Sequence, residues 1–259
     1  MKLRPRSLDE LTIVDEPSFR HVYLYADLKQ RLRDDDVRFA VPEPDSPLSH
    51  DPQVTLLNLG FWHPGGIAEI LPEDLIAADQ LVHCAWHHLA ARALGDEARS
   101  SDGLLMAEAV ASAFDLYLVG RLLGHAPDSD FLETQVPAMT DAALASGWEE
   151  EDAAQLFERA SAEPERAFEL LRQLLFDTAT ELAAARDANA AADVLLARAD
   201  HPMAPLLHHY ELVTWVLYSR CYATKHEPST IVREIDAALR AADDSVAWLE
   251  RHWLGGKSP

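Results

Sequence analysis

Helical periodicity from residue 72 onward constrains the fold of this chain more than any other feature of its sequence. A proline there suits the first turn of a helix that extends to about Leu94, where a glycine follows. A second helix is expected to start with Ser101 or Asp102 as its cap and to end at Leu123, again before a glycine. The same periodicity continues with short polar breaks and predicts further helices. These are expected at about 130–147, 149–161, 164–187, 189–199, 204–224 and 229–254.

The first 72 residues differ in character, because β-branched and aromatic residues are concentrated there in short stretches bounded by charge or proline. Such stretches are typical of strands, which are expected at 20–26, 37–42 and 53–62. The chain is therefore predicted to be predominantly α, of the α+β type. A small β-containing N-terminal segment over 1–72 is followed by a multi-helix bundle over 73–259, as two domains or as one continuous domain.

Composition and charge narrow the classes of function. The 259 residues include 44 acidic and 22 basic side chains, which give a formal net charge of −22. Binding to phosphates needs clustered Lys and Arg, so neither nucleic acid nor an anionic membrane surface is an expected partner. Two cysteines are too few for a disulfide framework. The sequence shows no signal peptide and no stretch typical of a transmembrane helix, and a cytoplasmic protein is expected.

Two histidines on the first helix are the leading candidates for a functional site. His83 and His87 are four residues apart, which places both imidazoles on one side of a helix. At about 100° per residue they lie at the edge of the apolar face formed around Val82 and Trp86, and they are expected to point inward. His88 falls on the opposite side and is expected to be exposed. Two inward imidazoles at this spacing can converge on one metal ion.

The helix over 101–123 supplies a second observation. Glu108 and Asp115 are seven residues apart and lie on one face that is otherwise apolar. Ionised carboxylates are rarely buried unless they are paired or bound to a metal. Glu108 is therefore the candidate third ligand and Asp115 a candidate for proton transfer, while pairing of both with arginines of later helices is the alternative.

A third observation comes from the segment 204–222. On a continuous helix, His208, Glu211 and Tyr218 would share one face, with His209–Tyr210 turned away. His208 and Glu211 would be a ligand pair, a pair that orients the ligands of the first helix, or a core histidine bonded to a glutamate. All three side chains are candidates for proton transfer at a metal site.

The stretch HCAWH at 83–87, followed after nineteen residues by AEAVASAFDLYLVG at 107–120, resembles the gluzincin metallopeptidases. In that family an HExxH helix gives two histidine ligands and a later helix gives a glutamate ligand. The resemblance implies a zincin-like layout, with strands before the histidine helix and helices after it. It also implies that His83, His87 and Glu108 hold the metal.

One position departs from the family's pattern. Where the family has the glutamate that activates the metal-bound water, this chain has Cys84. A thiol is a poor general base, so a hydrolase of this kind would take its base from elsewhere, such as Asp115 or Glu211. Two histidines and one carboxylate are also the ligand set of non-haem iron oxygenases.

Two functions from different classes follow. The first is a metal-dependent enzyme, either a degenerate zincin-like hydrolase or a non-haem iron oxygenase. It would hold a divalent zinc or iron ion on its two histidines and glutamate and act on a small molecule or a peptide. The second is a catalytically inert helical protein that binds a partner protein or assists assembly, and its histidines and acids form a buried polar network.

Overall fold

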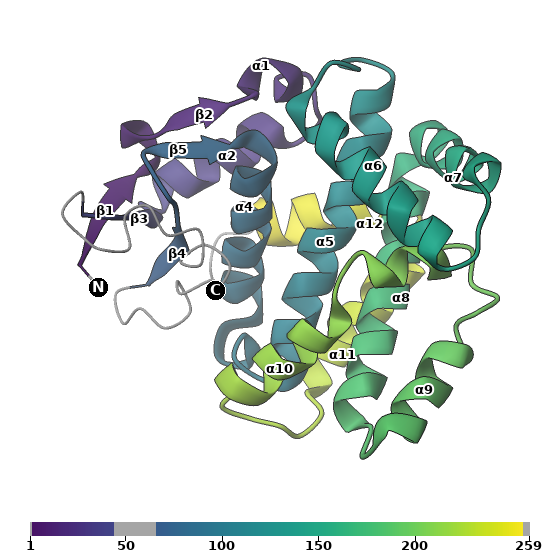
Figure 1. Cartoon of the computed structure of the whole chain (residues 1–259). Helices are drawn as coiled ribbons and strands as arrows, with labels where there is room; N and C mark the ends of the chain where they lie inside the picture. The colour runs from purple at the N-terminus through teal and green to yellow at the C-terminus, as the bar shows by residue number, and fades with distance from the viewer. Residues whose placement is uncertain (1, 44–65, 256–259) are drawn as a thin grey trace. The chain divides into compact units, whose positions relative to one another are not determined.

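The computed structural model describes residues 2–43 and 66–255, and the chain forms two compact units, Met1–His88 and Leu89–Pro259 (Figure 1). Helices dominate, and a small region of strands lies near the N-terminus. The predicted fold class, predominantly α with a small β part, is therefore confirmed. The predicted domain boundary after residue 72 stays a prediction.

The first unit contains two small sheets and several short helices. Its strands are β1 (Leu3–Ser7), β2 (Thr12–Val14), β3 (Arg38–Pro42), β4 (Ile67–Ile70) and β5 (Leu75–Ala77). Its helical segments before α4 include η1 (Leu8–Glu10), α1 (Glu16–Phe19) and α2 (Tyr25–Asp34). In one sheet β3 lies between β1 and β4, antiparallel to β1 and parallel to β4. In the other sheet, β2 and β5 pair in parallel.

Local sequence patterns predicted these strands only in part. The strand expected at 37–42 is confirmed as β3, the strand expected at 20–26 is wrong, and the one at 53–62 lies outside the described residues. Residues 20–26 instead form turns and then enter α2 at Tyr25. Leu28 and Leu32 recur at helical spacing and are fully buried, so burial of one helix face outweighs the strand preference of the aromatic residues before them.

The helix that carries His83 and His87 begins later than the sequence predicts. Residues 75–77 form β5, and α4 (Ala78–Leu94) follows without a break. Pairing with β2 draws the start of the expected helix into a sheet, because a strand partner far away in the sequence can override local helix preference. This pairing also fixes the point from which α4 starts.

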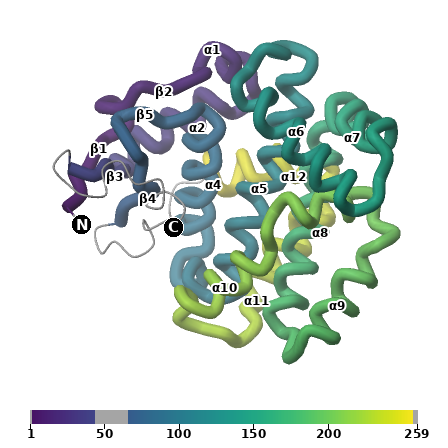
Figure 2. The backbone as a smooth tube through the Cα atoms, in the orientation of Figure 1, coloured from purple at the N-terminus to yellow at the C-terminus, as the bar shows by residue number. Residues whose placement is uncertain are grey.

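The second unit is a bundle built around α5. Its elements are η3 (Gly95–Glu97), α5 (Ser101–Leu123), α6 (Asp130–Ala145), α7 (Glu150–Ala162), α8 (Pro164–Ala184), α9 (Ala188–Leu196), η4 (Ala204–His208), α10 (Leu212–Tyr222), α11 (Thr230–Ala241), α12 (Ser245–Leu249) and the π-helical turn η5 (Glu250–Leu254). The helices α6, α7, α8, α10 and α11 all contact α5. Figure 2 shows this arrangement as a tube, with α9 at the edge of the unit.

Helix α5 ends at Leu123 as predicted, but its cap lies one or two residues before the expected Ser101 or Asp102. Ser100 is the N-cap, and its Oγ accepts a hydrogen bond of 3.0 Å from the backbone N–H of Gly103. Neither Ser101 nor Asp102 has this role. Asp102 instead accepts a hydrogen bond of 2.9 Å from the backbone N–H of Ser229, just before α11.

Two predicted helices are each divided in the structure. The segment 204–224 forms η4 and α10, separated by a turn in which Glu211 has a left-handed backbone with φ of 45°. The segment 229–254 forms α11, α12 and η5, and Asp244 caps α12 by accepting a hydrogen bond from the Ala247 N–H. A left-handed residue and a capping side chain both end a helical run locally, although the apolar periodicity continues.

Helix α5 is predominantly apolar. By length and composition it is the one helix of the described residues that could cross a membrane, with a mean hydropathy of 1.4 over an 18-residue window. Within the bundle, 78% of that window is buried. The packing is close: a Cβ atom placed on Gly120 would lie 2.3 Å from the carbonyl oxygen of Ala160 on α7. The absence of a side chain at residue 120 therefore allows α5 and α7 to approach each other.

A buried ion network joins α8 to α11. The side chain of Arg172 has no exposed surface and makes two hydrogen bonds to Glu169, of 2.8 and 2.7 Å, and one of 2.9 Å to Asp236. Arg240 continues the network by bonding Asp236 at 2.8 Å and Asp177 at 2.6 Å. Buried charge is tolerated here because each charged group has a partner of opposite charge.

Candidate metal centre

His83 and His87 lie one turn apart on α4, and both side chains are half-buried. Their Nε2 atoms are 3.1 Å apart, and their ring centroids are 4.8 Å apart with planes inclined by 56°. Two nitrogen ligands of one zinc ion are about 3.3 Å apart at the tetrahedral angle and about 2.9 Å apart at a right angle. The observed separation lies between these values, so the two rings are spaced to share an ion or a proton.

Glu108 belongs to the least buried stripe of α5. Between residues 102 and 120, the positions that are half-buried rather than fully buried are Leu104, Glu108 and Asp115. Spacings of four and seven residues place all three on one side of the helix. The helix therefore presents two carboxylates on the one face that the bundle leaves partly open.

His83 and His87 on α4 and Glu108 on α5 form a group that could hold a metal ion. One ligand atom from each, a ring nitrogen or a carboxylate oxygen, lies within 4.8 Å of the other two. Within residues 2–43 and 66–255, this is the one group of three or more His, Cys, Asp or Glu side chains that could hold a metal ion. Imidazole nitrogens and carboxylate oxygens are donors that both zinc and iron accept.

Cys84 lies next to His83 in the sequence but takes no part in the cluster. One step along a helix turns a side chain by about 100°, and here the step takes Cys84 into the core, where it is only 5% exposed. Burial raises the pKa of its thiol well above the ordinary value, and the carboxylates of Glu69 and Asp79 raise it further. The residue at the position of the gluzincin glutamate is thus a buried neutral thiol.

His88 is less exposed than its position on the helix predicts. Its Nε2 donates a hydrogen bond of 2.8 Å to Oδ2 of Asp35, and only 23% of the His88 side chain is exposed. The expectation of an exposed histidine is therefore wrong. Helix geometry gives the direction of a side chain but not the partner that another part of the chain brings to it.

The turn between η4 and α10 changes the placement of His208 and Glu211. Both are exposed, and both line an apolar groove of about 560 Å³ that also includes Leu195 and Val213. Tyr218 is half-buried, and its ring lies 5.8 Å from that of Tyr222. The shared helix face expected for His208, Glu211 and Tyr218 is wrong, because η4 ends at His208 and the α-helix begins only at Leu212. Their roles in proton transfer stay predictions.

Two residues that interact electrostatically with Asp115 are His209 and Tyr210, which the sequence periodicity turned away. Tyr210 is 7% exposed, and its hydroxyl has no hydrogen-bond partner among the described residues. Burial raises the pKa of Tyr210 well above its ordinary value, and the charge of Asp115 raises it further. Burial lowers the pKa of the neighbouring His209, although Asp115 and Glu211 oppose that shift. Sequence periodicity missed His209 and Tyr210, because nothing in the sequence at Glu211 indicates that the helix is interrupted there.

Comparison of the chain with protein-family models, with curated proteins and with solved structures finds no match. The resemblance to gluzincins is therefore supported only by the geometric cluster of His83, His87 and Glu108. The fold and the cluster together define a helical protein with a small strand region and a His/His/Glu site that could hold a metal ion.

Proposed function

We propose that this protein is a metal-dependent enzyme that holds a divalent zinc or iron ion through His83, His87 and Glu108. The observation that carries the proposal is that one ligand atom from each of these residues lies within 4.8 Å of the other two. Glu108 follows His87 by 21 positions and His83 by 25 positions. The spacing of 3.1 Å between the two Nε2 atoms fits ligands of one ion.

The three side chains suit either of two metals. Two imidazoles and one carboxylate form a three-ligand zinc site with a position left for water or substrate. The same set is typical of mononuclear non-haem iron sites. The chemistry supplied on binding would be polarisation of a substrate carbonyl or activation of water or dioxygen. A small molecule or a peptide is the proposed substrate class.

Asp115 is our first candidate for proton transfer. It lies on the same side of α5 as Glu108, two turns further on, which corresponds to about 10 Å along the helix axis. At this separation Asp115 would act on a substrate that extends along α5 from the ligands. His208, Glu211 and Tyr218 are further candidates for the same role, and they would need to reach the substrate from η4 and α10.

Metal analysis of protein purified without a histidine tag tests the proposal. We expect about one equivalent of zinc or iron after growth with both metals, measured by elemental analysis. The variants His83→Ala and Glu108→Gln should lower metal affinity by more than about tenfold. His88→Gln is the matched control, because it removes a histidine of the same helix that lies outside the cluster, and it should keep its metal.

Two results would contradict the proposal. Less than about a tenth of an equivalent of metal, without binding on addition of zinc or ferrous iron, would show that the cluster is not a metal site. Stoichiometric metal that survives both substitutions would place the ion elsewhere. Circular dichroism of each variant shows whether a loss of metal reflects loss of the fold.

The alternative function rests on the same contact. At 3.1 Å one His Nε2 can donate a hydrogen bond to the other, which is the start of a polar network in a protein without catalytic activity. This candidate predicts that no metal binds and that His83→Ala lowers stability. It gains support only from the first of the two contradicting results.

A further inference from the structure

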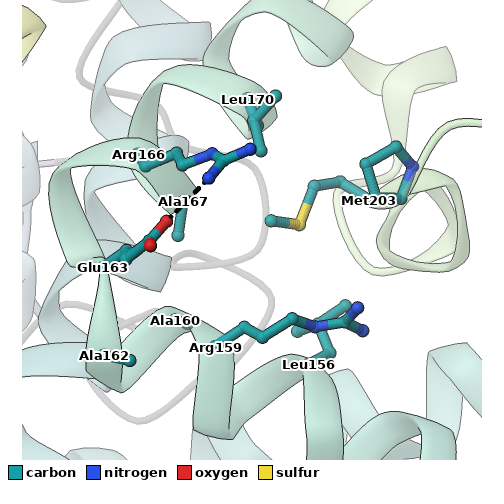
Figure 3. Close-up of a pocket in the computed structure, with 10 residues that line it drawn as sticks. Leu156, Arg159, Ala160, Ala162, Glu163, Arg166, Ala167, Leu170 and Met203 are labelled. Carbon is teal, nitrogen blue, oxygen red and sulfur yellow. Dashed lines mark hydrogen bonds and ion pairs between the residues drawn. The ribbon is translucent and has the colours of Figure 1, made fainter.

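A pocket separate from the His/His/Glu cluster lies within the second unit, where α7 meets α8. Its volume is about 310 Å³, at the lower end of the range for small-molecule sites. The walls are the last turns of α7, the first turns of α8 and the turn at Pro202 and Met203. Figure 3 shows the side chain of Met203 extending between those of Arg159 and Arg166.

The base of the pocket is apolar. Leu156, Ala160, Ala167 and Met203 all line it, and none of them is more than 6% exposed. Methionine has a flexible, polarisable side chain that adapts to apolar groups of different shape. The base is therefore suited to an aliphatic group.

The rim of the pocket carries a net positive charge. Arg166 Nη1 lies 3.0 Å from Oε2 of Glu163, so this pair is neutral overall. Arg159 donates a hydrogen bond of 3.2 Å from Nε to the backbone oxygen of Gln155, and it has no carboxylate partner among the described residues. Its Nη atoms are left to bind an anion.

We infer that this pocket binds a small aliphatic monocarboxylate, with the carboxylate on Arg159 and the alkyl chain against Met203. The guanidinium can donate two parallel hydrogen bonds to a carboxylate, which a neutral head group cannot accept in the same way. The apolar base removes the chain from water. The inference does not depend on the proposed metal site, since no residue is common to both.

Calorimetric titration with sodium octanoate tests the inference on the full-length chain. We expect saturable binding at millimolar concentration or below, and weaker binding of shorter carboxylates by up to about fourfold for each methylene removed. Octan-1-ol, which has the same chain without the charge, should bind at least about tenfold more weakly. Arg159→Gln should weaken octanoate binding by a similar factor.

Arg251→Gln is the matched control for this substitution. Arg251 is also exposed and also donates from Nε to the backbone oxygen four residues earlier, at 3.1 Å from Ala247, but it does not line the pocket. This variant should bind octanoate like the unmodified protein. Equal effects of Arg159→Gln and Arg251→Gln would overturn the inference, as would the absence of octanoate binding. Equal affinity for octanol and octanoate would overturn it too and indicate an apolar groove without selectivity for anions.

Discussion

The contact between α5 and α7 makes a quantitative prediction about stability. In Gly120→Ala, the added methyl group would start 2.3 Å from the carbonyl oxygen of Ala160 and 2.9 Å from its carbonyl carbon. Both are backbone atoms, so the clash cannot be relieved by rotating a side chain, and the helices must separate. Overpacking of this kind costs about 1–3 kcal/mol. For a chain of this size the corresponding fall in Tm is about 2–12 °C.

Gly124→Ala is the matched control on the same helix. Gly124 is the C-cap of α5, has a right-handed φ of −91°, and leaves open space where a Cβ atom would lie. Alanine there should be neutral or stabilising by up to about 1 kcal/mol, because it restricts the unfolded chain. Thermal unfolding followed by far-ultraviolet circular dichroism compares the two variants. The packing argument is refuted if Gly120→Ala is no less stable than Gly124→Ala.

Three further predictions concern charge and capping. Arg172→Ala removes the buried partner of Glu169 and Asp236 and should lower the free energy of unfolding, measured in urea, by about 3–5 kcal/mol. Arg166→Ala removes one member of an exposed pair and should lower it by less than about 1 kcal/mol. Equal losses would contradict the buried network. Burial lowers the pKa of His209 below 6.5, so the unfolded chain binds its proton more readily and stability falls as the pH drops through about 6.5. His209→Gln should therefore lose less stability than the unmodified protein between about pH 7.5 and pH 5.5, and an unchanged pH profile would argue against this effect. Ser100→Ala removes the N-cap of α5 and should lower the free energy of unfolding by about 0.5–2 kcal/mol. Ser101→Ala should stay within about 0.5 kcal/mol of the unmodified protein. A larger loss in Ser101→Ala than in Ser100→Ala would place the cap at residue 101.

The candidate metal centre shows how far local patterns carry. The spacing of His83 and His87 and the position of Glu108 on an apolar helix predicted the three side chains of the group that could hold a metal ion. The direction of each side chain is local information, because a helix fixes it relative to its neighbours. The same rule predicted an exposed His88, and it failed because Asp35 comes from another part of the chain.

The segment around residue 211 shows where local patterns end. Apolar periodicity continues through 204–224, yet one residue with positive φ divides the helix and rotates every side chain before it. His209 and Tyr210 thereby come within the electrostatic reach of Asp115, while His208 and Glu211 become exposed. The left-handed backbone at Glu211 costs about 1–2 kcal/mol, so favourable packing of the whole segment must offset it.

The sequence by itself determined the predominance of helix, the end of α5 at Leu123 and the choice of His83, His87 and Glu108 as candidate ligands. These depend on periodicity, on helix-ending glycines and on spacing along single helices, which act over a few residues. Only the tertiary structure decided that residues 75–77 are a strand, that Asp35 binds His88, and that Arg159 borders an apolar pocket. Each of these depends on a partner distant in the sequence, and the free energy of such a contact exists only once the chain has folded.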